Sequence, residues 1–288
     1  MAAIPCCVCC HPTKQPDDSY DPSCFTRTCF APMFGAKVLP LPDKGTASGK
    51  ILVVGTSKSK LSCTNGKVFN TGHNVSETLF PMYYLQHAGY TFDIATGDGK
   101  PFAFEDWSWA GPKANKNEAE LRGVLESNVG GFMKPLTTEA ALSNLKAGAY
   151  VAAFFPGGHG TMIEMHDPNH DGGAISQILA HLHEKAVPTI TLCHGPNVLR
   201  AAPEGTYKGY TLFGFPDSAD KQNAGPGYTP GMLKEWMGEE LAKVGVTLMN
   251  KSVNSQVHTD REVISACGPP GAAMLGVEAV KMLAMKRK

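Results

Sequence analysis

A cysteine followed directly by a histidine stands where an apolar run of the sequence ends. Pro188-Thr-Ile-Thr-Leu192 has the composition of a buried strand, and Cys193-His-Gly-Pro196 follows it without a gap. Proline suits the first turn of a helix, so a helix is expected from Pro196. A cysteine on such a strand-to-helix turn is held at the top of a sheet, where the helix N-terminus favours the thiolate. The pattern predicts Cys193 as a nucleophile, although most free cysteines are small buried hydrophobes.

His194 is the first candidate for a base that serves this cysteine. Neighbouring side chains on a sharp turn can point apart, and a catalytic histidine needs an orienting partner. Asp220 is the preferred partner, because it follows an expected strand over 209–214. Asp217 is the rival, and either aspartate could instead cap a turn or a helix.

Glu77 has two interpretations. Asn74 is a good N-cap residue, and a glutamate three places later is typical of a capping box. The functional alternative is a buried, protonated carboxyl beside the cysteine, which would donate a hydrogen bond to the thiolate.

A glycine-rich turn is the candidate oxyanion site. Pro156-Gly-Gly-His-Gly160 follows an apolar run that is expected to form a strand. Glycine leaves backbone N–H groups uncrowded, so Gly158 could contribute half of an oxyanion hole. A GGxG run alone is more often a simple turn.

Two other segments contain side chains that can ligate metals. His166-Asp-Pro-Asn-His-Asp171 is interpreted as a solvated loop. Cys6-Cys-Val-Cys-Cys10 contains overlapping CxxC spacings, but Cys24 and Cys29 form a poor second pair for a zinc site. The chain has nine cysteines, an odd and uneven set that does not resemble a secreted disulfide framework. No metal site is predicted.

The elements that must position these residues alternate between strand and helix. This alternation predicts an α/β fold with a mostly parallel sheet covered on both faces. Ligand sites in such sheets lie beyond the C-terminal ends of the strands. Residues 1–48 are expected to form an irregular, Cys-rich arm, and residues 49–288 the domain, with an insertion at about 98–147. Strands are expected near 51–55, 91–96, 150–155, 188–192, 209–214, 246–249 and 262–265; helices near 74–89, 117–127, 138–146, 174–186, 230–243 and 270–285.

The charge balance limits the classes of partner. Lys+Arg and Asp+Glu each number 26, so the chain lacks the basic excess that nucleic acids and anionic membranes require. No apolar run is long enough to span a bilayer, and the N-terminus resembles neither a secretory signal nor a transit peptide. The expected location is the cytoplasm, with possible access to the nucleus.

Four motifs together resemble a known family. PGGHG, LCHGP, FPDSADK and the segment TGHNVSETLFPMYYLQHAGY are similar to the PfpI-like cysteine superfamily, in particular its HchA-type branch of stress chaperones and glyoxalase III enzymes. The resemblance implies a flavodoxin-like sandwich that is commonly a homodimer. It also implies Cys193 as nucleophile, His194 and Asp220 as its partners, Glu77 as an essential carboxyl, and Gly158 with the His194 backbone as the oxyanion site.

The activity implied by the resemblance is cofactor-free conversion of methylglyoxal, an α-oxoaldehyde, to D-lactate, together with the deglycase activity proposed for the family. Some bacterial members bind a metal after the helix of Glu77, but the matching positions here are Gln86 and Thr91, so that site is not carried over. The alternative function is a holdase chaperone that binds unfolded clients on exposed apolar surface. The candidate surface is formed by Phe102, Phe104, Trp107 and Trp109.

Other cysteine chemistries fit the sequence less well. A glutamine amidotransferase would pair the cysteine with a distant His-x-Glu, whereas this chain offers only His258-Thr-Asp260. A cysteine protease would need a peptide groove. A redox-sensor role for Cys193 is compatible with each of these activities.

Overall fold

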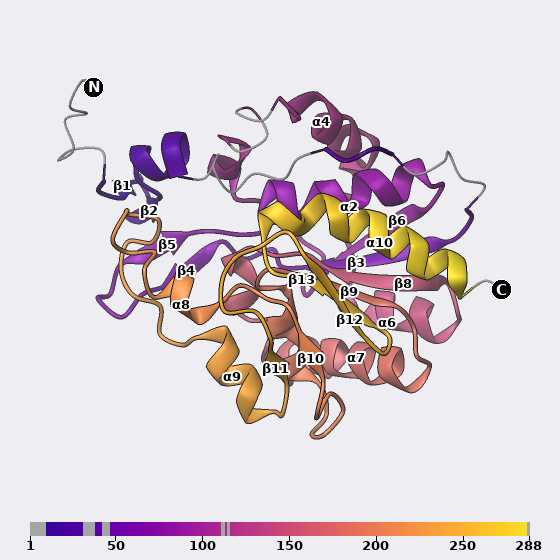
Figure 1. Ribbon diagram of the computed structural model, residues 1–288. Coiled ribbons are helices and arrows are strands. Elements are labelled where there is room, and N and C mark those ends of the chain that lie inside the picture. The colour runs from indigo at the N-terminus through magenta and orange to yellow at the C-terminus, as the bar shows by residue number, and fades with distance from the viewer. Residues whose placement is uncertain (1–9, 31–37, 42–46, 111–112, 114–115, 287–288) are drawn as a thin grey trace.

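A seven-stranded sheet in the order β12-β13-β9-β8-β3-β6-β7 forms the middle layer of the computed structural model, which describes residues 10–30, 38–41, 47–110, 113 and 116–286 (Figure 1). All neighbouring strands in this sheet are parallel except the pair β12 and β13. The strands are β3 (Lys50–Gly55), β6 (Thr91–Thr96), β7 (Leu136–Thr137), β8 (Tyr150–Phe155), β9 (Thr189–Leu192), β12 (Val257–Asp260) and β13 (Val263–Ala266). The predicted α/β architecture, with its mostly parallel sheet, is confirmed.

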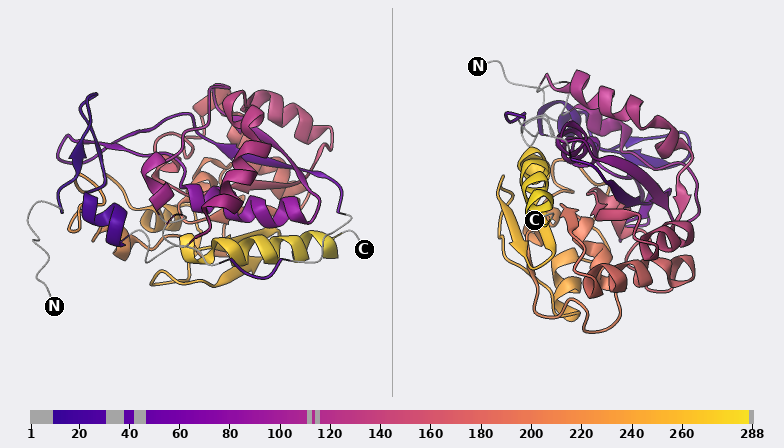
Figure 2. Two further views of the ribbon diagram at one scale, coloured as in Figure 1. Left: turned by 90° about the horizontal axis from the view of Figure 1, so that it is seen from above. Right: turned by 90° about the vertical axis from the view of Figure 1, so that its right-hand side faces the viewer.

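Two apolar cores lie on opposite faces of this sheet. Successive side chains of a strand alternate between faces, so Ile51 and Val53 join one core and Leu52 and Val54 join the other. Helices α2 (Val75–His87), α4 (Glu118–Ser127), α5 (Val129–Met133) and α10 (Ala272–Met285) cover the first core; α6 (Thr138–Lys146), α7 (Ala174–Glu184) and α9 (Met237–Lys243) cover the second (Figure 2).

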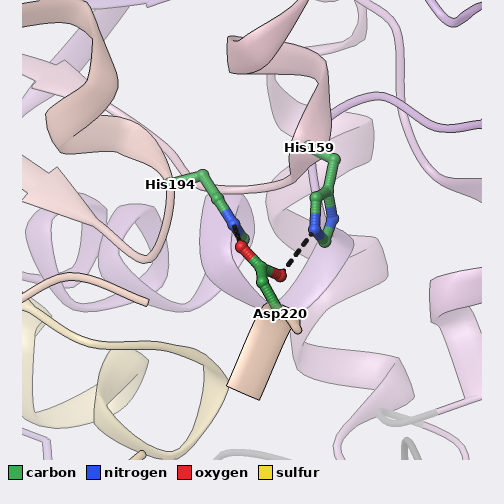
Figure 3. A group of neighbouring side chains, drawn as sticks. All are labelled: His159, His194 and Asp220. Carbon is green, nitrogen blue, oxygen red and sulfur yellow. Dashed lines mark hydrogen bonds and ion pairs between the residues drawn. The ribbon is translucent and has the colours of Figure 1, made fainter. Parts of the chain in front are cut away.

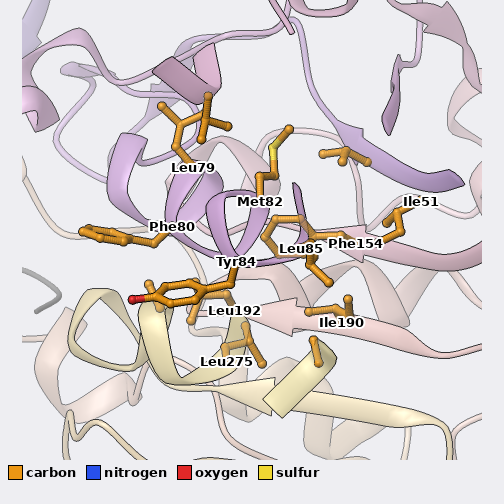
Figure 4. Packing of buried hydrophobic residues seen from close by; sticks show 14 of the residues in the cluster. Ile51, Leu79, Phe80, Met82, Tyr84, Leu85, Phe154, Ile190, Leu192 and Leu275 are labelled. Atoms are coloured by element: carbon orange, nitrogen blue, oxygen red, sulfur yellow. The ribbon is translucent and has the colours of Figure 1, made fainter. Parts of the chain in front are cut away.

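The two longest helices of the first layer, α2 and α10, pack side by side. Tyr84 of α2 and Leu275 of α10 belong to one buried cluster with the strand residues Ile190 and Leu192, and Figure 4 shows these side chains close together. The labelled residues are almost fully buried. This contact fixes the start of α2, and so the position of Glu77, against the end of β9.

The segment expected as an insertion extends the main layers. Strand β7 pairs with β6 at the edge of the central sheet, α4 and α5 contribute to the first core, and α6 contributes to the second. Residues 98–147 therefore share both cores of the domain.

The expected irregular arm contains regular structure in its described part. Strands β1 (Thr13–Lys14) and β2 (Ser19–Asp21) join β5 (Val68–Asn70) and β4 (Lys60–Ser62) in a four-stranded sheet. The π-helical turn η1 (Thr26–Phe30) follows β2 in the chain. Pairing with strands of the domain supplies order that the arm's own sequence pattern does not indicate. The cysteines at positions 6, 7 and 9 lie outside the described residues.

Some expected elements are shorter than their sequence patterns. The helix expected over 230–243 is confined to α9, since Pro230 and Gly231 keep the preceding residues in turns. The helix expected from Pro196 is the 3₁₀ helix η5 (Gly195–Ala201). The strands expected near 209–214 and 246–249 are the short parallel pair β10 (Thr211–Leu212) and β11 (Thr247–Leu248).

No helix among the described residues is both long and apolar enough to span a membrane.

A glycine-to-alanine pair tests the α2–α10 contact. A Cβ on Gly276 would lie 2.9 Å from Cδ2 of Tyr84 and 3.0 Å from Cα of Pro81, whereas one on Gly123 of α4 would meet nothing within 4 Å. Alanine is the better helix former by about 0.5–1 kcal/mol. We therefore expect Gly123→Ala to raise the free energy of unfolding, and Gly276→Ala to lower it by about 1–3 kcal/mol because the helices must separate. Urea unfolding of both variants measures this, and equal gains would contradict the close contact.

Candidate active site

Cys193 occupies a strained turn between β9 and η5. Its φ angle is +59°, in the left-handed region that residues other than glycine seldom adopt. The backbone holds it there, because the Cys193 N–H donates to the Ala266 carbonyl at 2.9 Å and its carbonyl accepts from the Phe215 N–H at 2.8 Å. A Cβ on Gly195 would lie 2.2 Å from the Phe155 carbonyl, so the turn requires glycine there. The strand-to-helix elbow expected from the sequence is present.

His194 contacts the cysteine despite being its neighbour in sequence. Its Nδ1 lies 3.3 Å from the Cys193 Sγ, and its Nε2 lies 2.7 Å from Oδ2 of Asp220 (Figure 3). The imidazole stacks on Phe215, with ring centroids 5.0 Å apart. Cysteine, histidine and aspartate are thus connected in line, as in hydrolases whose nucleophile is activated by a base.

Asp217 and Asp220, the two candidate partners of His194, lie at opposite ends of the short helix α8 (Asp217–Asp220) and make different contacts. Asp217 caps α9 by accepting hydrogen bonds from the N–H groups of Gly238 at 2.7 Å and Glu239 at 2.9 Å. Asp220, at the other end of α8, is the residue that reaches His194.

Asp220 is a fully buried charge with several donors around it. Burial alone would raise the pKa of this carboxyl, but the His194 and His159 imidazoles hold its pKa well below the usual range. Oδ1 accepts from Nε2 of His159 at 3.0 Å and from Nδ2 of Asn223 at 2.9 Å. Asp220 is therefore an ionised anchor for His194.

Glu77 combines a helix-start position with a side chain that faces the cysteine. Asn74 caps α2 as expected, accepting from the N–H groups of Ser76 and Glu77. The Asn74 N–H, which a capping-box glutamate would bind, donates instead to the Gly157 carbonyl at 3.3 Å. Glu77 is 1% exposed and lies against the Cys193 thiol. The capping-box interpretation is therefore wrong for its side chain.

Burial governs the protonation of this pair. Burial raises the pKa of Glu77 to about 8, opposed in part by the Cys193 thiol and the Gly158 N–H. Burial, then the negative charges of Glu77 and Asp220, raises the pKa of Cys193. The 3₁₀ helix after the cysteine has only seven residues, so its dipole is small. Both shifts favour the protonated forms, a thiol beside a carboxylic acid, whereas the sequence pattern favours the thiolate.

The glycines of the expected oxyanion turn allow this contact. A Cβ on Gly157 would lie 2.1 Å from Oε2 of Glu77 and 2.5 Å from Cβ of Cys193, so no other residue fits. The Gly158 N–H lowers the pKa of both the Glu77 carboxyl and the Cys193 thiol, so it lies close to both groups.

These groups line a cavity of about 830 Å³. Aromatic side chains form much of its wall, and Phe25 comes from the N-terminal arm. The arm is fixed there because Ser23 and Thr26 donate through their hydroxyls to the Pro226 carbonyl, at 2.8 and 2.9 Å. Residues lining the cavity include Phe25, Asn74, Glu77, Trp107, Gly158, His159, Cys193, His194, Phe215, Lys251 and Tyr228.

The structure adds His159 and Glu105 to the predicted site. His159 belongs to the PGGHG motif, so the sequence did indicate its position. The functional interpretation of that motif, however, concerned only the backbone of its glycines. Glu105 is 1% exposed, accepts from the Thr71 hydroxyl at 2.7 Å, and interacts electrostatically with His159. Its segment showed no periodicity that would place it near a cysteine far along the chain.

The aromatic cluster considered for client binding is largely internal. Phe102 is 6% and Trp107 9% exposed. Phe102 and Phe104 pack on Phe132, while Trp107 donates from Nε1 to the Asn70 carbonyl at 3.1 Å. Trp109 lies under the Arg122 guanidinium. The exposed apolar patch that the chaperone alternative would use is therefore not found at these residues, which pack inside the domain as ordinary core residues do.

The candidate metal positions are engaged in other contacts. Oε1 of Gln86 accepts from Nδ2 of Asn128 at 2.9 Å, and Thr91 lies on β6. Within the His166–Asp171 run, His170 pairs with Asp171 and Glu164. The described residues contain one cluster with metal-ligand spacing, formed by His159, His194 and Asp220. Its two Nε2 atoms bond to different oxygens of the carboxylate, which is the arrangement of a hydrogen-bond network.

The sequence profile of the DJ-1/PfpI family matches residues 67–282. The chain belongs to the DJ-1/PfpI family. Among family members, it is 33% identical over 273 residues to the protein/nucleic acid deglycase HchA of Escherichia coli (strain 55989 / EAEC), covering 93% of each chain. The same identity and coverage hold for the HchA of Shigella boydii serotype 18.

Solved structures of similar fold include two with TM-scores above 0.6. Glyoxalase III from Candida albicans has a TM-score of 0.62 at 22% identity, covering 82% of this chain and 98% of that one. The Rapid Encystment Protein of Francisella tularensis has a TM-score of 0.63 at 21% identity, covering 82% and 99%. These likenesses place the DJ-1/PfpI chain among flavodoxin-like α/β proteins, as the sequence predicted.

The raised pKa of Glu77 predicts a specific pH dependence of stability. A carboxyl whose folded pKa is raised stabilises the fold fully below its unfolded value, and this contribution is lost as pH rises through the folded pKa. Glu77→Gln cannot ionise, so its free energy of unfolding should gain on the wild type between pH 4.5 and about 8. The gain should be at most ~1.4 kcal/mol per pH unit.

Denaturant unfolding at several pH values measures this difference, and the exposed Glu126→Gln of α4 is the matched control. A difference between wild type and Glu77→Gln that does not change over this pH range would contradict a protonated Glu77.

Proposed function

We propose that this protein converts α-oxoaldehydes to 2-hydroxy acids without glutathione, taking methylglyoxal to D-lactate, and that it also acts on aldehyde adducts of amines and thiols. The observation that carries the proposal is the contact of the Cys193 thiol with both the His194 imidazole and a protonated Glu77, in the wall of a large cavity. This arrangement offers a nucleophile that contacts both a base and an acid. The names of the HchA relatives support the same class of chemistry.

The first step forms a covalent hemithioacetal. His194 takes the proton of the Cys193 thiol while the sulfur bonds to the aldehyde carbon, and Asp220 stabilises the resulting imidazolium. The aldehyde oxygen gains the electron pair of the carbonyl and takes the proton of Glu77. The Gly158 N–H lies where it can stabilise the intervening oxyanion, an effect of about 3–4 kcal/mol in other enzymes.

The second step moves hydrogen between the two carbons. Glu77, now ionised, removes the proton from the former aldehyde carbon, and the electrons form an enediolate whose oxygen is protonated by His194. Glu77 then returns its proton to the neighbouring carbon, and the hydroxyl on the first carbon loses its proton to His194, which leaves a thioester. Addition of water and departure of the Cys193 sulfur release the hydroxy acid and restore the thiol. The net reaction adds one water to the oxoaldehyde, with no oxidant or reductant.

The size of the cavity supports a role on adducts. At about 830 Å³, it lies in the range of pockets that enclose drug-sized ligands, and methylglyoxal has only three carbons. The remaining space is bounded by Trp107, Tyr228 and Phe25 and could hold the side chain that carries an adduct.

Replacement of the nucleophile gives the primary test. We expect chelator-treated wild type to consume methylglyoxal and form D-lactate without glutathione, and Cys193→Ala to fall to the uncatalysed rate because no covalent intermediate can form. His194→Ala should lower kcat by about 10²–10⁴-fold, the usual contribution of a general base. Aldehyde loss and stereospecific lactate assays follow both ends of the reaction.

Cys63→Ala is the matched control. Cys63 is also buried, but it follows β4 of the four-stranded sheet and packs against Phe69 and Trp107. Wild-type protein that forms no lactate, or a Cys193→Ala variant with wild-type turnover, would refute the proposal.

Action on adducts requires its own measurement. Mixtures of N-acetylcysteine and methylglyoxal can be prepared in which the hemithioacetal concentration varies while free methylglyoxal stays constant. If the adduct is a substrate, the initial rate should increase with the hemithioacetal concentration. A rate that follows only the free aldehyde would restrict the activity to methylglyoxal itself.

A further inference from the structure

His159 is a second buried histidine on the anchor of the proposed triad. Its Nε2 lies 3.0 Å from Oδ1 of Asp220, while the His194 Nε2 lies 2.7 Å from Oδ2 (Figure 3). The two imidazole rings are also close to each other, with centroids 4.1 Å apart. One carboxylate therefore serves as the counter-ion of two adjacent imidazoles.

The hydrogen bonds determine where each ring carries its proton. A carboxylate only accepts, so both Nε2 atoms must be donors. A neutral ring then has an unprotonated Nδ1. In His194 this atom faces the Cys193 sulfur, 3.3 Å away. In His159 it is buried and finds no hydrogen-bond partner among the described residues.

A buried acceptor without a partner, such as Nδ1 of His159, lowers the free energy of unfolding by about 1–3 kcal/mol. A residue that only donates to Asp220 would not need this second nitrogen. An amide side chain could also donate to the carboxylate, but its own carbonyl oxygen would then be a buried acceptor as well. The second nitrogen of His159 gives the position one property that an amide lacks, which is a site that can accept a proton.

The surroundings of His159 define how such a proton would act. Asp220 and His194 lie on one side. The rings of Phe69 and Tyr228 enclose it, with centroids 5.7 and 5.6 Å away. Glu105 is the further acidic group that interacts with it. The cavity wall contains four more titratable groups, on Glu77, Cys193, Tyr228 and Lys251.

We propose that His159 is a positioning residue whose protonation controls the basicity of His194 through their shared carboxylate. When His159 is neutral, the charge of Asp220 is available to stabilise the imidazolium that His194 becomes on taking the Cys193 proton. When His159 is protonated, a second cation lies against the same carboxylate and beside the same ring. His194 then accepts the thiol proton less readily, and the nucleophile is held inactive in acid.

This inference rests on the proposed roles of Cys193 and His194, but not on the identity of the substrate. It can therefore be tested through the thiol alone. The rate constant for alkylation of Cys193 by iodoacetamide, followed by mass spectrometry of the peptide that contains it, reports formation of the thiolate at each pH.

His159→Gln is the informative variant, because the glutamine Nε2 can keep the donor to Asp220 but cannot take up a proton. We expect the wild type and this variant to react at similar rates at pH 8. Below the transition of His159, the wild-type rate should fall more steeply, so that the variant becomes about tenfold more reactive for each further pH unit. His183→Gln, which replaces a histidine paired with Glu262 elsewhere on the domain, should follow the wild type.

Superimposable profiles for wild type and His159→Gln would overturn the inference, and so would a folded His159→Gln protein whose Cys193 is unreactive at every pH. Methylglyoxal turnover by the same samples separates the two proposals. Normal turnover with superimposable profiles refutes only the role of His159, whereas a shifted profile without turnover refutes only the proposed substrate.

Discussion

Burial of the Asp220 charge is the constraint on which the arrangement of the site depends. A carboxylate removed from water must be surrounded by donors, and loss of one donor would leave an uncompensated charge. Its donors come from three separate segments: the turn after β8 supplies His159, the elbow supplies His194, and the loop after α8 supplies Asn223. The same loop continues to Pro226, where the N-terminal arm attaches. One buried charge thus links the arm, the elbow and the glycine-rich turn.

The pairing of Cys193 with Glu77 explains how a buried thiol can be both stable and reactive. Burial disfavours either negative charge, so the resting pair keeps both protons. In the proposed mechanism each proton has a separate route during attack, the thiol proton to His194 and the carboxyl proton to the substrate oxygen. A thiol that ionises only with a carbonyl in place is also less exposed to oxidation than a free thiolate.

The fold was predictable to the extent that its signals are local. Strands that are buried on both faces, such as β3 and β8, appear in the sequence as apolar runs. Their alternation with helices indicates a parallel sheet. The edge strand β12 (Val257–Asp260) was missed because three of its four residues are polar and none is fully buried. The strands of the arm were missed because they are only two and three residues long and because β2 pairs with β5 in the domain. Pairing across long sequence separations leaves no periodicity in either segment.

The site shows the same division between local and distant information. Cys193 and its elbow could be identified because strand, turn and helix start are consecutive, whereas the choice of Asp220 over Asp217 depended on which end of a four-residue helix faces His194. Glu77 fits a capping pattern in the sequence. In the structure its side chain contacts Cys193 instead, and this contact depends on the absence of a side chain at Gly157. Sequence patterns record what a residue does for its own element. A buried polar side chain that its element does not need, such as Glu77 or His159, is positioned by its contacts with another part of the fold. Accounting for each buried charge and hydrogen-bonding group is therefore the step that connects this fold to its chemistry.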